Sequence, residues 1–312
     1  MRDPAPPLRD PRLAELQLLA DLEGGNKQVH FSEEAPSEKT YGLGASAFSD
    51  LVIHLLLDGV VNGPSALSSA GGLGTGTITE GETPIDDLVQ GLLAEHLGDV
   101  FKKKWVWLHL NHKGRLRLWG LRDELLSRRK LEPFGILRAR EDWERDLDLG
   151  FIFMPPGSVL SVVFCDVDHF KDVNDKLGHA AGDEALKFCF QTIKDTVERV
   201  GEAYRYGGDE VVILLPNVGE EKARLLAEEI RGRVEANFPA GEKYAALTSR
   251  PTLSIGSATF TVRCDPNAAT RAADSLVYQS KREGRNRVTA RTYTSPPPAD
   301  PDPIVPARHS TA

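Results

Sequence analysis

One short stretch of the sequence decides the fold of its C-terminal half: Arg205-Tyr206-Gly207-Gly208-Asp209-Glu210-Val211. Two glycines separate the apolar segments Tyr204–Tyr206 and Val211–Leu215, whose composition is typical of β-strands. The stretch therefore predicts a hairpin with Gly207 and Gly208 in its turn. It also places two adjacent carboxylates, Asp209 and Glu210, beside that turn.

Segments on both sides of this hairpin alternate between strand and helix patterns. Ser158–Val167 is an apolar run that predicts a buried strand, and Asp183–Val197 repeats its apolar residues at helical spacing. Further helices are expected near 219–236 and 268–283, and further strands near 252–260 and 287–293. The alternation predicts an α/β domain over about 132–293, with a central sheet that contains antiparallel strands and is flanked by helices.

Three groups of charged residues in this domain suggest a chemistry. Asp166 and Asp168 follow the apolar strand, and Asp209 and Glu210 follow the glycines. Carboxylates on adjacent strands can bind hard divalent cations. Basic residues crowd the far end of the domain, where they could hold phosphate oxygens: Lys281, Arg282, Arg285 and Arg287. Together the groups indicate phosphoryl or nucleotidyl transfer, although each group alone also has an ordinary interpretation as a solvated strand end, a turn or a solvated helix face.

The composition excludes several other classes of protein. A net charge of −8 argues against nucleic-acid binding over the whole surface. The three cysteines have no CxxC spacing, so reduced cytosolic thiols are expected and a metal or disulfide framework is not. No apolar run approaches the length of a membrane span, and we expect a cytoplasmic protein without membrane contact.

Four separated segments resemble the signatures of GGDEF domains, the palm-like catalytic domains of diguanylate cyclases. The name-giving motif is similar to Arg205–Val211, with Val211 in place of the usual Phe. The other matching segments are Cys165-Asp166-Val167-Asp168-His169-Phe170-Lys171-Asp172-Val173-Asn174-Asp175 with Gly178-His179 and Gly182-Asp183, then Ser254-Ile255-Gly256, then Ala273-Asp274 through Tyr278, Lys281 and Gly284-Arg285-Asn286. The resemblance covers about half of the chain.

The resemblance implies that two GTP molecules are condensed into cyclic di-GMP and pyrophosphate with Mg²⁺ or Mn²⁺, in a head-to-head pair of domains. It implies metal ligands at Asp166, at the Val167 carbonyl and at Asp209, and catalytic roles for Asp209 and Glu210. It assigns the binding of GTP to a longer set: Phe170, Lys171, Asn174, Asp183, Gly207, Gly208, Lys281 and Arg285. Among these, Asn174 and Asp183 would read the guanine edge, because a carboxylate accepts from guanine N1–H and adenine has no such donor.

Three departures from the family pattern carry expectations of their own. Val211 exchanges one apolar residue for another and should leave activity intact. The segment Pro133–Arg140 is only distantly similar to the usual start of the domain. The Arg and Asp of the family's product-inhibition site would fall at Glu198 and Gly201, so no inhibitory site is expected.

The N-terminal part divides into a segment with a short helix (1–40) and a winged-helix-like regulatory domain (41–131), and a disordered tail (294–312) ends the chain. Leu13, Leu16 and Leu19 predict the short helix. Helices at 45–58 and 84–98 would precede a strand-turn-strand unit, Trp105–Leu110 and Arg115–Leu121 around His112-Lys113-Gly114. Residues 101–130 hold ten Lys or Arg against two acids, so this domain is interpreted either as a DNA contact or as a protein-binding or dimerising module.

Two hypotheses follow from the sequence. The first is a cytosolic dimeric diguanylate cyclase that is regulated by its N-terminal domain. The second is a catalytically weak regulator that senses GTP and binds DNA or protein.

Overall fold

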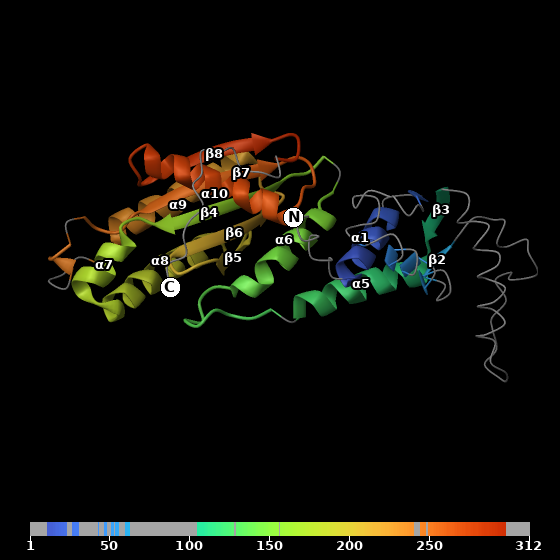
Figure 1. Cartoon of the computed structure of the whole chain (residues 1–312), viewed down its shortest axis with the longest axis horizontal. Coiled ribbons are helices and arrows are strands. Elements are labelled where there is room, and N and C mark those ends of the chain that lie inside the picture. Colours follow the sequence, from blue (N-terminus) through green and yellow to red (C-terminus); the bar gives the residue numbers. More distant parts are fainter. Residues whose placement is uncertain are drawn as a thin grey trace, which may run out of the picture. The chain divides into compact units, whose positions relative to one another are not determined.

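The computed structural model describes residues 11–23, 27–30, 43, 47–48, 51–52, 54–55, 60–62, 105–127, 129–155, 157–239, 244–247 and 249–297. The chain divides into two compact units, Met1–Ser127 and Arg128–Ala312 (Figure 1). None of the described helices combines the length and the apolar character needed to cross a membrane.

A five-stranded sheet with the order β5-β6-β4-β7-β8 forms the centre of the C-terminal unit. Its strands are β4 (Leu160–Val167), β5 (Glu202–Arg205), β6 (Glu210–Pro216), β7 (Leu253–Phe260) and β8 (Arg287–Tyr293). β4 pairs antiparallel with β6 and β7, β5 pairs antiparallel with β6, and β7 pairs parallel with β8. The predicted hairpin and the predicted antiparallel content of the sheet are confirmed.

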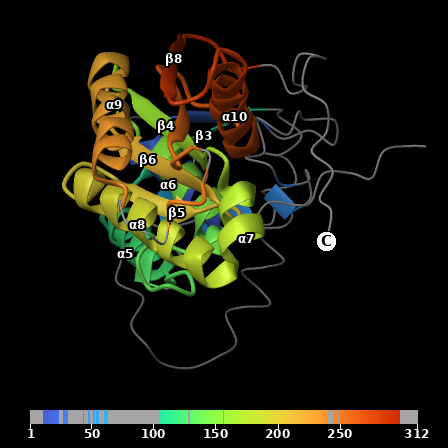
Figure 2. The ribbon, with the colours of Figure 1, turned by 90° about the vertical axis from the view of Figure 1, so that its left-hand side faces the viewer.

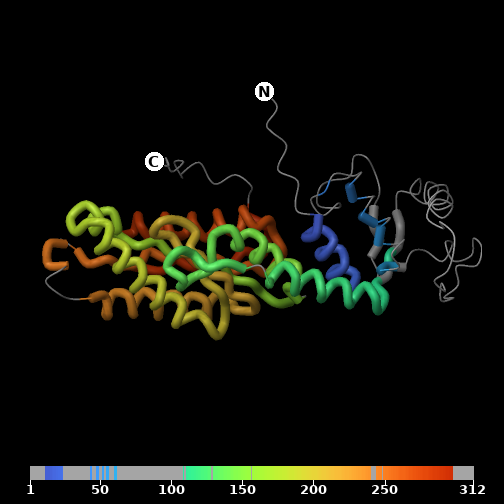
Figure 3. Tube along the Cα trace, turned by 90° about the horizontal axis from the view of Figure 1, so that it is seen from below, coloured from blue at the N-terminus to red at the C-terminus, as the bar shows by residue number. Residues whose placement is uncertain are grey.

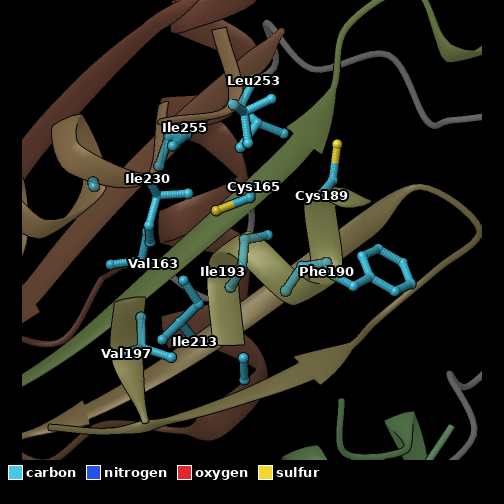
Figure 4. Packing of buried hydrophobic residues seen from close by; sticks show 14 of the residues in the cluster. Val163, Cys165, Cys189, Phe190, Ile193, Val197, Ile213, Ile230, Leu253 and Ile255 are labelled. Carbon is cyan, nitrogen blue, oxygen red and sulfur yellow. The ribbon is translucent and has the colours of Figure 1, made fainter. Parts of the chain in front are cut away.

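The central strand β4 is buried along its whole length because helices cover both faces of the sheet. Val163, Cys165 and Val167 pack with residues of α8 (His179–Val197) and α9 (Glu220–Asn237). Val162 and Phe164 face the opposite way, toward α6 (Trp143–Ile152) and α10 (Pro266–Arg282). Figure 2 shows α9 and α10 on either side of the sheet, and Figure 4 shows the packing around Cys165 on the first face.

Two helices of the unit had no counterpart in the sequence prediction. α6 begins at Trp143, whose Nε1–H donates to Thr270 Oγ1 of α10 over 3.0 Å. α7 (Phe170–Leu177) follows β4 through His169, whose φ of 61° turns the chain sharply out of the sheet. α7 packs against α8 and carries one of the signature segments.

The N-terminal unit contains α1 (Pro11–Glu23), α5 (His112–Ser127) and a three-stranded sheet of β1 (Lys27–His30), β3 (Trp105–Leu110) and β2 (Val61–Asn62). The predicted N-terminal helix is confirmed as α1, which packs beside α5 (Figure 3). Its Glu15 accepts two hydrogen bonds from Arg117 of α5, at 2.7 and 3.1 Å. The described positions 47–48, 51–52 and 54–55 are helical, and the predicted helix at 84–98 and most of the tail lie outside the described residues.

The predicted strand at Arg115–Leu121 is wrong, and with it the strand-turn-strand unit of the winged-helix interpretation. These residues belong to α5, which begins after Asn111, and the Asn111 side chain accepts a hydrogen bond from the Gly114 N–H over 2.9 Å. Leu118, Leu121 and Leu125 are buried at helical spacing, whereas Leu116 is 62% exposed. Leu116 and Leu118 alternate as apolar residues do in a strand, but only Leu118 is buried, together with residues at helical spacing from it.

Candidate active site

Two carboxylates face each other at one end of the central sheet. Asp166 on β4 and Glu210 on β6 are direct cross-strand partners, and such partners project from the same face of a sheet. This face also carries Phe164 and Val212, and α10 covers it. Asp166 is 4% exposed. The register thus brings together two acids that stand 44 positions apart in the sequence.

Backbone hydrogen bonds at the hairpin turn fix the position of Glu210. The N–H groups of Tyr206 and Gly207 both donate to the Glu210 carbonyl, over 2.8 and 3.2 Å. A Cβ atom at Gly207 would lie 2.5 Å from Glu210 Oε2, so the glycine leaves the room that the Glu210 carboxylate occupies. Asp209 is half-buried, and its carbonyl accepts from the Val167 N–H over 3.3 Å. Val167 and Asp209 are therefore neighbours across the strand ends.

Cations approach this acidic end from the last turn of α10. Lys281 Nζ lies 2.5 Å from Asp166 Oδ2. Arg285, three residues past the helix, is exposed, and its Nε lies 3.9 Å from Asp168 Oδ1. The other two predicted members of the basic group have different contacts, because Arg287 pairs with Glu283 and Arg282 lies over the Tyr278 ring. Of the four basic residues, Lys281 and Arg285 are the two that reach the acidic strand end.

The donor set at this end has the chemistry of a hard-cation site. Asp166, Asp209 and Glu210 supply carboxylate oxygens, which are the ligands that Mg²⁺ and Mn²⁺ prefer. Within the part of the chain that the structure describes, no three His, Cys, Asp or Glu side chains gather closely enough to form a metal cluster. The Lys281 ammonium lies beside Asp166. The residues thus fit a divalent ion in donor type.

The residues expected to read guanine come from α7 and α8. Gly182 on α8 is buried, and a Cβ atom there would meet the Asn174 side chain and, at 3.3 Å, Phe170 Cζ. Asp183 follows Gly182 and is exposed, as is Lys171 in the first turn of α7. The packing of α7 on α8 therefore gathers Phe170, Asn174 and Asp183, and Lys171 lies on the outer side of α7.

Asp168 differs from Asp166, although the sequence analysis grouped them. The Asp168 carboxylate is 1% exposed and accepts hydrogen bonds from Thr252 Oγ1, Ser254 Oγ and the Asn286 N–H, at 2.7, 2.7 and 3.1 Å. A carboxylate with these donors is already satisfied and holds structure together. Strand alternation gives no signal that separates the two acids, because residues two positions apart share a face, and Asp168 lies past the end of β4 at Val167.

A turn ahead of α6 supports the hairpin from outside the sheet, and sequence reasoning missed it. Glu132 is 5% exposed and accepts from the N–H groups of Phe134 and Ile136, both over 3.0 Å. Its Oε2 also accepts from Arg205 Nη1 over 3.3 Å. Arg205 in turn donates to the Gly208 carbonyl over 2.9 Å. Glu132, directly before the segment Pro133–Arg140, thus holds the Gly207-Gly208 turn through Arg205.

The position of the exchanged motif residue explains why Val fits. Val211 is 1% exposed and pairs with Cys165 across the β4–β6 register. Its side chain belongs to the apolar cluster on the α8 and α9 face, opposite to Asp166 and Glu210. The Phe-to-Val difference thus affects packing on the far side of the sheet.

Part of the chain is similar in sequence to known proteins. The family "Diguanylate cyclase, GGDEF domain" matches residues 153–287. Diguanylate cyclase DosC of Escherichia coli K12 is 42% identical over 135 residues, which cover 42% of this chain and 28% of DosC. Diguanylate cyclase A of Treponema denticola is 37% identical over 131 residues, or 42% of this chain and 34% of that protein. The chain thus spans about a third or less of these curated relatives.

Solved structures of isolated domains are matched over most of their length. The GGDEF domain of DgcB from Caulobacter crescentus, solved in complex with c-di-GMP, is 30% identical, with 49% of this chain and 91% of that one covered and a TM-score of 0.45. The active GGEEF domain of a diguanylate cyclase from Vibrio cholerae is also 30% identical, covering 50% of this chain and 97% of that one, with a TM-score of 0.45. Residues 153–287 of the C-terminal unit are thus similar to the GGDEF-domain family of diguanylate cyclases.

Proposed function

We propose that this protein condenses two molecules of GTP into cyclic di-GMP with the release of two pyrophosphates. The observation that carries the proposal is the pairing of Asp166 with Glu210 across two strands, with Lys281 beside them. A buried Asp166 and a half-buried Glu210 with an adjacent lysine suit a nucleoside triphosphate and a divalent ion better than they suit an uncharged substrate.

The reaction joins each nucleotide to the other. The 3′-oxygen of one GTP forms a bond to the α-phosphorus of the second, the bond from that phosphorus to its bridging oxygen breaks, and pyrophosphate leaves. The 3′-hydroxyl proton passes to a base, for which Glu210 is our candidate. When bound, a divalent ion neutralises the triphosphate and favours ionisation of the attacking hydroxyl. A second identical step closes the ring.

The protein's own residues would orient the substrate. Lys281 and Arg285 hold phosphate oxygens, and Asp166, the Val167 carbonyl and Asp209 serve the metal. Gly207 and Gly208 let the phosphates approach the turn. On the other side, the Asp183 carboxylate accepts from the guanine edge and the Asn174 amide donates or accepts there, beside Phe170, and Lys171 offers a further cation at the rim.

Because one domain holds one GTP, the reaction needs two domains that face each other. The specific activity should therefore rise with protein concentration until the pair is saturated. A concentration-independent rate per protein would contradict a reversible pair of domains.

The test is a product analysis of the full chain with GTP and Mg²⁺ or Mn²⁺. The unchanged protein should form cyclic di-GMP and pyrophosphate, and Asp209→Ala should form neither. Asp195→Ala removes an exposed carboxylate of α8 and serves as the matched control with full activity. GTP binding without any cyclic di-GMP at high protein concentration would instead favour the GTP-sensing regulator, and full activity of Asp209→Ala would overturn the metal assignment.

A further inference from the structure

The turn that carries Arg285 has an unusual backbone. Gly284, Arg285 and Asn286 all have positive φ values, at 116°, 63° and 46°. Side-chain-bearing residues adopt such values only when surrounding contacts hold them there. The contacts of the turn therefore account for its positive φ values.

The Asp168 carboxylate is the contact that holds the middle of the turn. Its Oδ2 accepts from the Asn286 N–H over 3.1 Å, and the same oxygen accepts from Thr252 Oγ1 over 2.7 Å. Its Oδ1 accepts from Ser254 Oγ over 2.7 Å and lies 3.9 Å from Arg285 Nε. Hydrogen bonds to a buried charge are the strong ones, so this carboxylate ties the turn to β7.

The Asn286 side chain fixes the other side of the turn. Its Nδ2 donates to Glu235 Oε1 over 2.7 Å, and its Oδ1 accepts from Arg231 Nη1 over 2.9 Å, both on α9. At the helix end, the Arg285 N–H donates to the Ser280 carbonyl over 2.9 Å. The turn is thus attached to α9, α10 and the β4 end, and Asp168 supplies the attachment at the β4 end.

We propose that Asp168 is a positioning residue for the triphosphate: it binds no metal, and it holds the 284–286 turn so that Arg285 faces the phosphates. The two acids at the end of β4 then have different roles: Asp166 binds cations, and Asp168 holds the turn. Thr252 and Ser254 complete the arrangement by filling the remaining lone pairs of Asp168. This inference rests on the proposed function for the identity of the nucleotide.

The test compares two nucleotides that share guanine but differ in phosphates. The ligands are GMP and a GTP analogue with a methylene group in place of the α,β-bridging oxygen, which cannot release pyrophosphate. Affinities for both are measured by calorimetry with Mg²⁺ for the unchanged protein, Asp168→Ala, Asp168→Asn and Arg285→Ala. Ser161→Ala is the matched control, because Ser161 makes buried hydroxyl contacts to Val218 O and Thr259 Oγ1 at the opposite end of β4.

Loss of the Asp168 attachment should selectively weaken the binding of the triphosphate. Asp168→Ala is expected to reduce affinity for the analogue about tenfold while affinity for GMP stays within about twofold. Asp168→Asn keeps an oxygen for the Asn286 N–H and should recover part of the loss. Ser161→Ala should leave both affinities unchanged.

A double-mutant cycle identifies the route of the effect. If Asp168 acts through Arg285, Asp168→Ala should add little to the loss caused by Arg285→Ala. Equal weakening of the analogue and GMP, or losses that multiply in the double variant, would overturn the inference. If Asp168→Ala does not fold, Asp168→Asn and Ser254→Ala give the same comparison with smaller changes.

The outcome separates this inference from the proposed function. A protein that binds the analogue selectively through Asp168 but forms no cyclic di-GMP would refute only the proposed function. If the unchanged protein forms cyclic di-GMP but Asp168→Ala weakens the binding of GMP and of the analogue equally, only the role of Asp168 would be refuted. Failure of the unchanged protein to bind the analogue would refute both.

Discussion

Lys281 on α10 forms an ion pair with Asp166 at the end of β4, with 2.5 Å between Lys281 Nζ and Asp166 Oδ2. The pair joins the two charge groups that the sequence presents more than a hundred residues apart. Asp166 is 4% exposed, and Lys281 places a positive charge beside its buried carboxylate. On the proposed metal assignment, the ammonium and a divalent ion compete for the same carboxylate.

Removal of the ammonium should expose this competition. Without nucleotide, Lys281→Ala is expected to bind Mn²⁺ more tightly than the unchanged protein, since the buried carboxylate has lost its neutralising partner. The same variant should have a higher KM for GTP. Manganese binding is followed by electron paramagnetic resonance. Lys222→Ala, an equal charge change on the exposed side of α9, is the control, and weaker Mn²⁺ binding by Lys281→Ala would contradict the idea.

The hairpin turn offers a sharp steric test. In Gly207→Ala the new methyl group would lie 2.5 Å from Glu210 Oε2, so the carboxylate has to move. Since that neighbour is the flexible end of a side chain, we expect little loss of stability but a clear fall in kcat. Gly232→Ala on α9 meets nothing within 4 Å, and it should raise the free energy of unfolding by about 1 kcal/mol without changing kcat. Unchanged turnover in Gly207→Ala would refute the role of the Glu210 position.

Glu132 should contribute stability out of proportion to its place in a loop. Glu132→Ala removes the acceptor for three backbone N–H groups and for Arg205, and we expect a loss of about 2 to 3 kcal/mol in the free energy of unfolding. Denaturant unfolding measures it. Glu221→Ala removes an exposed glutamate that pairs with Arg224 and should change stability little. Equal effects of the two substitutions would contradict this account.

The buried thiol of Cys189 predicts a loss of stability in alkali. Burial raises the pKa of this thiol from its ordinary value of 9.0 to about 12. Between pH 9.0 and about 12, the thiol ionises in the unfolded chain but stays protonated in the fold. The free energy of unfolding is therefore fully present below pH 9.0 and falls as the pH rises toward about 12. Unfolding free energies measured across this window should fall less steeply in Cys189→Ala. Parallel curves for both proteins would argue against the shift.

Added product should not inhibit this protein. Glu198 and Gly201 stand where family members carry the Arg and Asp of the inhibitory site. The structure gives a reason for the glycine, since a Cβ atom at 201 would meet the backbone oxygen of Leu214. Turnover measured with increasing cyclic di-GMP is expected to stay constant, and inhibition in the micromolar range would show that another surface binds the product.

Much of the C-terminal fold could be predicted because its signals are local. The apolar run of β4, the glycines before Glu210 and the helical spacing on α8 each report the structure of their own segment. The motif residues also predicted GTP as substrate. The N-terminal unit was harder to predict, because Leu116 and Leu118 satisfy a strand pattern until burial decides in favour of α5.

The sequence by itself predicted which acids, cations and glycines the candidate active site contains, because chemistry follows residue type and motif spacing. Only the tertiary structure decided how these residues are combined. Asp166 and Asp168 are two positions apart, yet Asp166 pairs with Lys281 and Asp168 accepts from the Asn286 N–H. Strand register pairs Asp166 with Glu210, and a buried carboxylate takes whichever donors the packed elements bring to it. Sequence spacing along the chain contains no information about those donors.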